Sequence, residues 1–149
     1  MAAIYLDTSA LVKLYLREEG TERMRSLVSG PNPPSLVLLA LARAELHSAL
    51  RRRQRLGDID GEETATVIAR FESHLRTRFL HQPVNDVVVD TACHLLARHP
   101  LRAYDALQLA GCVVFSGASP DRVAFACADK RLLEAAEKEQ VAGLDPTEA

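Results

Sequence analysis

Short apolar runs alternate along the chain with longer segments in which apolar residues recur every three or four positions. The runs predict strands at residues 4–6, 35–39, 79–82 and 122–126, with a fifth, short edge strand at 141–144. Helical spacing lies between them, in segments 11–15, 21–28, 40–56, 60–76, 86–99, 103–115 and 130–140. Strands that alternate with helices indicate a parallel sheet covered by helices on both faces. The pattern therefore predicts an α/β protein with a central sheet of four or five strands.

Turn and capping residues mark the ends of several predicted helices. Gly57 stands where the helix of segment 40–56 needs a left-handed residue to stop. Asp60 followed by Glu63 resembles a capping box that opens the next helix. Asn85 or Asp86 can cap the helix that Pro100 ends.

Composition restricts the class of protein. The chain has 149 residues, of which 48% are hydrophobic and 26% charged, which suits one domain spanning residues 1–149. No apolar run approaches the ~20 residues of a membrane span, and the first residues lack the basic and apolar regions of a signal peptide. We therefore expect a soluble, cytoplasmic protein. Cys93, Cys112 and Cys127 lack metal-ligand spacing and are expected to be reduced core residues.

The net charge of −2 argues against a protein that binds nucleic acid through overall basicity. A local basic patch remains open, because most of the 18 basic residues are Arg, whose planar fork suits phosphate groups. Arg51, Arg52, Arg53 and Arg55 crowd one helix end. They are either a solvated last turn that complements the helix dipole or a contact for substrate phosphates.

Two aspartates follow predicted strands directly. Asp7 follows the first strand, where the period changes from strand to helix, and Asp129 stands similarly after the fourth strand. Each could simply cap the helix that follows it. However, open α/β sheets bind ligands outside the carboxyl ends of their strands, so both residues are also candidates for a site.

Two further acidic residues lie on predicted helices. Glu45 lies in an apolar helical segment, where a carboxylate is costly unless it is paired with Arg43 or another Arg, or binds a cation. Asp105 lies in the first turn of a helix that soon becomes apolar, where the helix dipole alone would favour it. Four carboxylates that converge on one crevice would favour hard cations such as Mg²⁺ or Mn²⁺.

The segments that carry these acids resemble the motifs of PIN-domain nucleases, specifically the VapC-like ribonuclease toxins of type II toxin–antitoxin systems. The resemblance covers nearly the whole chain and rests on YLDTSALVK (5–13), AELHSAL (44–50) followed by GDI (57–59), YDALQLA (104–110) and FACADKRLLEA (125–135). It implies a three-layer α/β/α sandwich with a parallel sheet in the strand order 3-2-1-4-5. It also implies that Asp7, Glu45, Asp105 and Asp129 are catalytic metal ligands and that Ser9 lines the site.

The same resemblance implies an activity and partners. Two cations about 4 Å apart would activate water and stabilise the leaving oxygen of a phosphodiester. A metal-dependent endoribonuclease of this kind leaves a 5′-phosphate and a 3′-hydroxyl. The expected substrate is an exposed loop of tRNA or rRNA. The expected partners are a second copy of the chain and a small DNA-binding antitoxin.

One position departs from the family pattern. Cys127 stands two residues before the last aspartate, where the family often has Thr or Ser. The lost hydroxyl makes Asp129 the least secure of the four ligands, and it keeps a second hypothesis open. That hypothesis is a PIN-like scaffold that binds RNA or a protein partner without cleaving RNA.

Other enzyme classes fit the sequence less well. A haloacid-dehalogenase-like phosphatase needs a second Asp two residues after the first, and Ser9 occupies that position. A receiver domain needs paired acids after its first strand, which are absent. A serine hydrolase needs a Gly-x-Ser-x-Gly elbow, which is also absent.

Overall fold

The computed structural model describes residues 2–148 and is built around a five-stranded sheet. The strands are β1 (Ala3–Leu6), β2 (Ser35–Leu39), β3 (Phe79–Gln82), β4 (Val123–Ala126) and β5 (Ala142–Leu144). All neighbouring strands are parallel, and their order is β3-β2-β1-β4-β5. The predicted strands, including the short fifth one, and the order implied by the family resemblance are confirmed.

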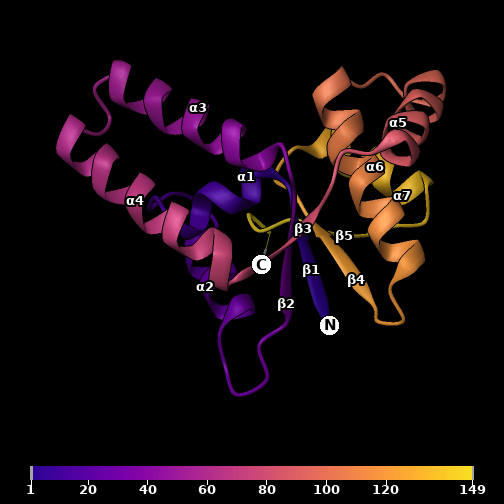
Figure 1. Ribbon diagram of the computed structural model, residues 1–149, viewed down its shortest axis with the longest axis horizontal. Helices are drawn as coiled ribbons and strands as arrows, with labels where there is room; N and C mark the ends of the chain where they lie inside the picture. Colours follow the sequence, from indigo (N-terminus) through magenta and orange to yellow (C-terminus); the bar gives the residue numbers. More distant parts are fainter. Residues whose placement is uncertain (1, 149) are drawn as a thin grey trace.

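Helices cover both faces of this sheet (Figure 1). One layer contains α1 (Thr8–Leu11), the 3₁₀ helix η1 (Val12–Leu14), α2 (Thr21–Val28), α3 (Ala42–Arg55) and α4 (Gly61–Thr77). The other layer contains α5 (Asp86–Arg98), α6 (Ala103–Ala118) and α7 (Lys130–Lys138). The predicted three-layer α/β/α sandwich is therefore confirmed.

The alternation of side chains along β1 explains why the sheet needs two covering layers. Ile4 and Leu6 pack into the core beneath α2, α3 and α4, whereas Tyr5 packs into the core beneath α5, α6 and α7. All three side chains are fully buried. A strand that is apolar on both sides must be covered on both sides, which only a helical layer on each face achieves.

Three local predictions about helix ends are confirmed. Gly57 has a φ of +84° just after α3, in the left-handed region that favours glycine. The Asp60 carboxylate accepts a 2.7 Å hydrogen bond from the Glu63 backbone N–H at the start of α4. Asn85, and not Asp86, caps α5 by accepting from the Val88 N–H at 3.0 Å.

Other local predictions are wrong in part. The first helix is split into α1 and η1, and α6 continues to Ala118, three residues past the predicted end. Cys93 is exposed and not a core residue, while Cys112 and Cys127 are buried as predicted. The inward face of α5 is formed by Val88, Ala92 and Leu95. Cys93 follows Ala92 directly, and because each residue of an α-helix is rotated by about 100° from the one before it, Cys93 points away from this face.

The register of the central strands determines where the chain's acids meet. Leu6 at the end of β1 lies beside Ala126 at the end of β4, so the segments that follow both strands leave the sheet at the same edge. No helix in residues 2–148 is long and apolar enough to cross a membrane.

Candidate functional site

Asp7 follows β1 directly and is buried, with 6% of its surface exposed. Its backbone N–H donates to the Ala126 carbonyl at 3.0 Å, which extends the pairing of β1 with β4 by one residue. Its carboxylate accepts hydrogen bonds from the Ser9 backbone N–H at 3.3 Å and from the Ser9 hydroxyl at 2.7 Å. Asp7 is therefore the N-cap of α1, as the simpler hypothesis predicted, and its carboxylate is held in one orientation.

Ser9 connects the two turns that leave the sheet. Its Oγ donates to Asp7 Oδ2 and accepts a 2.9 Å hydrogen bond from the Ala128 backbone N–H. These bonds join the turn after β1 to the turn after β4. Ser9 thus fixes the position of Asp7 relative to the segment that carries Asp129.

Cys127 follows β4 directly and is buried. Its thiol lies 3.5 Å from Asp7 Oδ2 as a donor, and it accepts from the Asp129 backbone N–H at 3.3 Å. Burial is the largest cause that raises the pKa of this thiol, and the neighbouring Asp7 charge adds to it. The sulfur is therefore a neutral hydrogen-bonding group that orients the same two aspartates.

Asp129 is exposed and begins α7. Its Oδ1 accepts from the backbone N–H groups of Arg131 at 2.9 Å and Leu132 at 3.4 Å. One carboxylate oxygen is thus occupied by capping, as the simpler hypothesis predicted. No hydrogen bond within residues 2–148 is recorded for its Oδ2.

Asp105 lies in the first turn of α6, where the sequence placed it, and is half-buried. The neighbouring Tyr104 and Gln108 hold this end of α6 against α1. The Gln108 side-chain amide donates to the Tyr104 hydroxyl at 2.9 Å and to the Thr8 hydroxyl at 3.3 Å. Because Thr8 follows Asp7 in the chain, this network sets the position of Asp105 relative to Asp7.

The aspartates repel one another. Burial is the main cause that raises the pKa of Asp7, and the charge of Asp105 raises it further against the opposing hydrogen bonds from Ser9 and Cys127. Burial also raises the pKa of Asp105, with a second contribution from the charge of Asp129 and opposition from Arg102 and Arg131. Asp7, Asp105 and Asp129 therefore form one electrostatically coupled group, which we call the aspartate cluster.

Glu45 lies in the first turn of α3 and is half-buried. The predicted alternative of a salt bridge to Arg43 is wrong, because Arg43 pairs with Glu72 through a 2.8 Å contact. Within residues 2–148, Glu45 forms no salt bridge. The pKa of Tyr104 is raised to about 12, first by burial and then by repulsion from Glu45 and Asp7, so Glu45 also carries its charge near the start of α6.

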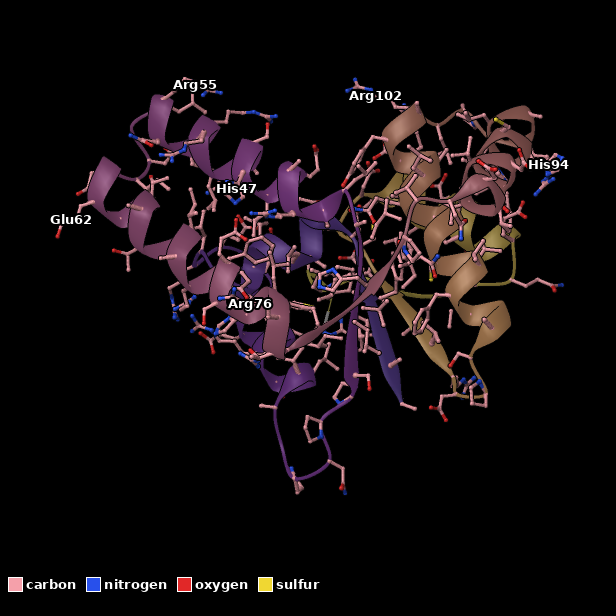
Figure 2. The ribbon with its side chains drawn as sticks, in the orientation of Figure 1. His47, Arg55, Glu62, Arg76, His94 and Arg102 are labelled. Atoms are coloured by element: carbon pink, nitrogen blue, oxygen red, sulfur yellow. The ribbon has the colours of Figure 1, made fainter. Side chains whose placement is uncertain are left out.

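A cavity of about 490 Å³ opens beside two of the aspartates. Asp105 and Asp129 line it together with the cationic side chains of Arg102, Lys130 and Arg131. Figure 2 shows Arg102 at the start of α6, projecting away from the ribbon. An anion that enters this cavity would meet cations around the acidic residues.

The Arg cluster of the sequence lies elsewhere. Arg52, Arg53 and Arg55 occupy the last turn of α3, and Figure 2 shows Arg55 far from Arg102. Along the helix axis, Arg55 lies about 15 Å from Glu45. Arg53 pairs with Glu18 and Arg51 bonds to Gln54, so part of the cluster is used within the fold.

The aspartate cluster has the chemistry of a site for a hard cation. Its ligands are carboxylate oxygens, its charges are mutually repulsive, and a divalent cation would neutralise them. In residues 2–148, no three His, Cys, Asp or Glu side chains stand close enough together to hold an ion as they are. The donor chemistry fits a metal, and binding would have to draw the carboxylates closer.

Several residues that shape this region were missed by sequence reasoning. Thr8, Tyr104 and Gln108 form the network between α1 and α6, and Arg102 and Arg131 line the cavity. A signal for Gln108 was present, because a polar residue stood within an apolar helical run. The cavity cations gave no such signal, since exposed Arg residues occur throughout the chain.

Comparisons with known proteins identify relatives of the chain. The family model described as PIN domain matches residues 4–138. Ribonuclease VapC46 of Mycobacterium tuberculosis is 38% identical over 110 residues, which cover 74% of this chain and 74% of that protein.

Solved structures share the fold at lower identity. A toxin–antitoxin complex from Klebsiella pneumoniae contains a chain that is 15% identical, with a TM-score of 0.65 and coverage of 98% of this chain and 99% of that chain. The Sarcin-Ricin loop cleaving toxin VapC20 of M. tuberculosis is 19% identical, with a TM-score of 0.64 and coverage of 89% and 94%. The chain therefore belongs to the PIN-domain family, and within it the chain is a homologue of the VapC ribonuclease toxins of toxin–antitoxin systems.

Proposed function

We propose that this protein is a Mg²⁺- or Mn²⁺-dependent endoribonuclease that cleaves exposed loops of tRNA or rRNA and acts as the toxin of a toxin–antitoxin pair. The observation that carries the proposal is the aspartate cluster. Asp7, Asp105 and Asp129 come from three separate segments. Burial raises the pKa of Asp7 and of Asp105, and repulsion adds to it, from Asp105 on Asp7 and from Asp129 on Asp105. Such clusters are characteristic of functional sites, because folding alone gains nothing from repulsion. We also infer that residues 1–149 form a single domain and that the three aspartates therefore belong to one domain.

In this proposal Asp7, Asp105 and Asp129 hold the metal, and Glu45 supplies a fourth carboxylate. When bound, the metal supplies an activated water and stabilises the leaving oxygen of the phosphodiester, so that a 5′-phosphate and a 3′-hydroxyl result. Ser9 and Cys127 act as positioning residues, since both bond to Asp7 Oδ2 and thereby fix one ligand. Tyr104 and Gln108 position the start of α6, which carries Asp105.

The cations around the cavity are proposed to hold the substrate. Arg102, Lys130 and Arg131 line the same cavity as Asp105 and Asp129, so a phosphate bound there would lie beside the acids. Single-stranded loops are the places where a protein can reach RNA bases and backbone together. This favours a loop substrate over a regular duplex.

Cleavage of RNA tests the central proposal. Purified protein should cut total RNA in the presence of Mg²⁺ or Mn²⁺ and lose this activity in EDTA. Asp105→Asn should lower the rate by more than about a hundredfold, because even residues that only support a metal ligand contribute ten- to a hundredfold. Asp90→Asn, at an exposed position of α5, is the matched control and should cleave like the wild type.

The outcomes distinguish three mechanisms. Cleavage that survives EDTA, or products that end in a 2′,3′-cyclic phosphate, would refute metal-assisted hydrolysis. RNA binding without cleavage under any metal condition would favour the non-catalytic scaffold, in which the acids serve another purpose. The Asp90 control separates a loss of charge in general from a loss at the cluster.

We further propose that the protein acts in the cytoplasm as a homodimer and is neutralised there by a small DNA-binding antitoxin. The support is homology to the toxins of such systems. Co-expression with the protein encoded by an adjacent reading frame should rescue growth and yield a complex on co-purification. Size-exclusion chromatography with light scattering should give twice the chain mass for the isolated protein. A monomer that co-purifies with no neighbour-encoded protein would contradict both parts.

A further inference from the structure

A second cavity, of about 380 Å³, lies beside the C-terminal half of α4. Leu36 and Phe79, which line it, stand at the amino ends of β2 and β3. The aspartate cluster follows the carboxyl ends of β1 and β4 instead. The two cavities are therefore at opposite ends of the strands, and they share no lining residue.

The charged side chains that line this second cavity are all basic. Arg25 comes from α2, Arg70 comes from α4, and Arg78 is the residue that follows α4, with His74 between Arg70 and Arg78 in sequence. No Asp or Glu contributes to the lining. Arg25 has a carboxylate nearby, at 3.7 Å in the exposed Glu22, whereas Arg70 and Arg78 form no salt bridge within residues 2–148. We call this feature the arginine cavity.

Part of the arginine cavity is held in place by contacts within the protein. The Arg70 guanidinium donates to the Leu14 carbonyl at 3.3 Å and lies 5.1 Å from the centre of the Tyr15 ring. The Tyr15 hydroxyl is bonded to His74 Nδ1 at 2.7 Å. The pKa of His74 is lowered by burial and by the charges of Arg78 and Arg70. The two cations therefore repel a proton on His74, and no anion offsets this repulsion among the causes of the shift. A fixed cation without a counter-charge is a ready donor to an incoming anion.

We propose that the arginine cavity is a binding site for a phosphate group. Three guanidinium groups, from α2, from α4 and from the residue that follows α4, suit a group with several charged oxygens, because each planar fork can donate two parallel hydrogen bonds. A single carboxylate would use only one of the three forks. The half-buried Leu14 and Val28 form apolar wall beside the cations, against which a sugar or base attached to the phosphate would pack.

The phosphate has two possible sources. It belongs either to the backbone of bound RNA, which would then extend past the catalytic edge, or to a free nucleotide. Both present the same chemistry to the arginines. The site itself is independent of RNA cleavage, so its test uses binding and not activity.

Pyrophosphate, titrated by calorimetry in EDTA, tests the site directly. EDTA removes any divalent metal that could otherwise bridge pyrophosphate to the aspartate cluster. Arg78→Gln and the double variant Arg70→Gln with Arg78→Gln should bind at least about tenfold more weakly, since a hydrogen bond to a charged group contributes about 1.5–3 kcal/mol. Arg76→Gln is the control, because Arg76 is an exposed arginine of α4 that lines a different cavity and is labelled in Figure 2. The Arg78 side chain forms no salt bridge or hydrogen bond within residues 2–148, so a folding defect is not expected to mask the result of Arg78→Gln alone.

A second arm identifies the source of the phosphate. A single-stranded RNA oligonucleotide is titrated against Asp7→Asn protein, which should not cleave it, with and without the arginine substitutions. If the RNA backbone is the source, the double variant should bind RNA more weakly, and the slope of log K against log salt should become shallower by about 1.4. Unchanged RNA binding with weakened pyrophosphate binding assigns the site to a free phosphorylated molecule.

Two results would overturn the proposal. The first is a failure of the wild-type protein to bind pyrophosphate, or binding by the Arg78 variants that is as tight as binding by the Arg76 control. The second is binding of a polyglutamate peptide, dependent on Arg70 and Arg78, in protein that does not bind pyrophosphate. That result would assign the cavity to an acidic protein partner.

Discussion

Asp7 combines two roles that oppose each other in the free energy of folding. As N-cap of α1 it accepts the Ser9 N–H, which stabilises the helix start. As a buried carboxylate with a raised pKa it destabilises the metal-free protein at neutral pH. Asn can also cap a helix but carries no charge, so one substitution separates the two roles.

Asp7→Asn should be at least as stable as the wild type in EDTA at pH 7.5, and its advantage should shrink as the pH falls. The direction of this pH dependence follows from the raised pKa of Asp7 in the folded protein. The wild type loses stability relative to Asp7→Asn as the pH rises through that pKa, because Asp7 then becomes charged in a buried position. Denaturant unfolding at several pH values between 4.5 and 7.5 measures the difference. Added Mn²⁺ should reverse the order, since the wild type gains about 2.7 kcal/mol at a hundredfold excess over Kd. A mutant that is much less stable at every pH in EDTA would show that Asp7 is chiefly structural.

Gly111 illustrates a close approach that the sequence pattern could not reveal. A Cβ at this position of α6 would overlap the Tyr5 hydroxyl and would lie 2.8 Å from Leu39 Cδ1. The Tyr5 hydroxyl has no hydrogen-bond partner in residues 2–148. Glycine is therefore required here by packing against β1 and β2, and not by backbone conformation.

Gly111→Ala should lower the free energy of unfolding by about 1–3 kcal/mol through overpacking. In a Tyr5→Phe background the same change should cost less, because the overlapping oxygen is gone while the Leu39 contact remains. Tyr5→Phe alone should be neutral or slightly stabilising, since the hydroxyl is unpaired. A double-mutant cycle from urea unfolding gives the coupling between the two positions. Additive effects would contradict the proposed overlap.

At the scale of elements, the sequence predicted most of the fold because its local signals agree with its tertiary packing. Gly57, Asp60 and Asn85 each marked a helix end, and each has the expected backbone or capping contact. The errors arose where tertiary contacts decide. Glu45 was assigned a possible partner from proximity in sequence, yet Arg43 turns to Glu72 on α4 instead.

The candidate site was predicted only in its residue types. The positions of Asp7 and Asp129 follow from the rule about strand ends, but their coupling to Asp105 depends on how α6 sits against α1. That placement uses the Thr8, Tyr104 and Gln108 network, whose members lie about a hundred residues apart in the chain. No local pattern encodes such a contact.

A partly buried ion triad joins η1 and α3 through Glu18 in the loop that follows η1. Lys13 of η1 bonds to Glu18 at 2.8 Å, and Arg53 at the end of α3 pairs with the other Glu18 oxygen. Lys13 is only 6% exposed, so its charge depends on Glu18 for compensation. Removal of one partner from a buried pair is strongly destabilising, because the remaining charge is left without compensation.

Glu18→Gln should therefore lower the free energy of unfolding by about 3 kcal/mol. Glu22→Gln provides the control, because its 2.9 Å pair with Arg17 is exposed and should be worth less than about 1 kcal/mol. Thermal or urea unfolding of both variants at pH 7 gives the comparison. Equal effects of the two substitutions would show that the triad is no more important than a surface pair.

Across the whole molecule, basic residues gather in separate regions although the net charge is only −2. Arg102 and Arg131 lie beside the aspartate cluster, while Arg51 and Arg55 lie toward the far end of α3. The sequence left open whether the α3 residues hold substrate phosphates or form a solvated last turn. The geometry makes the cavity residues a competing prediction.

The two pairs can be compared in catalytically inactive protein. If the cavity holds substrate, Arg102→Gln with Arg131→Gln should weaken binding of a single-stranded RNA and flatten its salt dependence by about 1.4 in slope. Arg51→Gln with Arg55→Gln removes the same charge from α3 and should change the slope little. Filter binding at several salt concentrations measures both. The reverse result would return the phosphate contact to the end of α3.

The order of the strands also affects how the chain acquires its fold during synthesis. β1 is made first, yet it occupies the centre of the sheet and pairs with β4, whose Val123 lies beside Ala3. At roughly 5–20 residues per second, the ribosome needs on the order of ten seconds to reach β4 after it has made β1. For most of that interval Asp7 is present without Asp105, and for all of it without Asp129. A nascent chain therefore cannot assemble the aspartate cluster until β4 and Asp129 have left the ribosome.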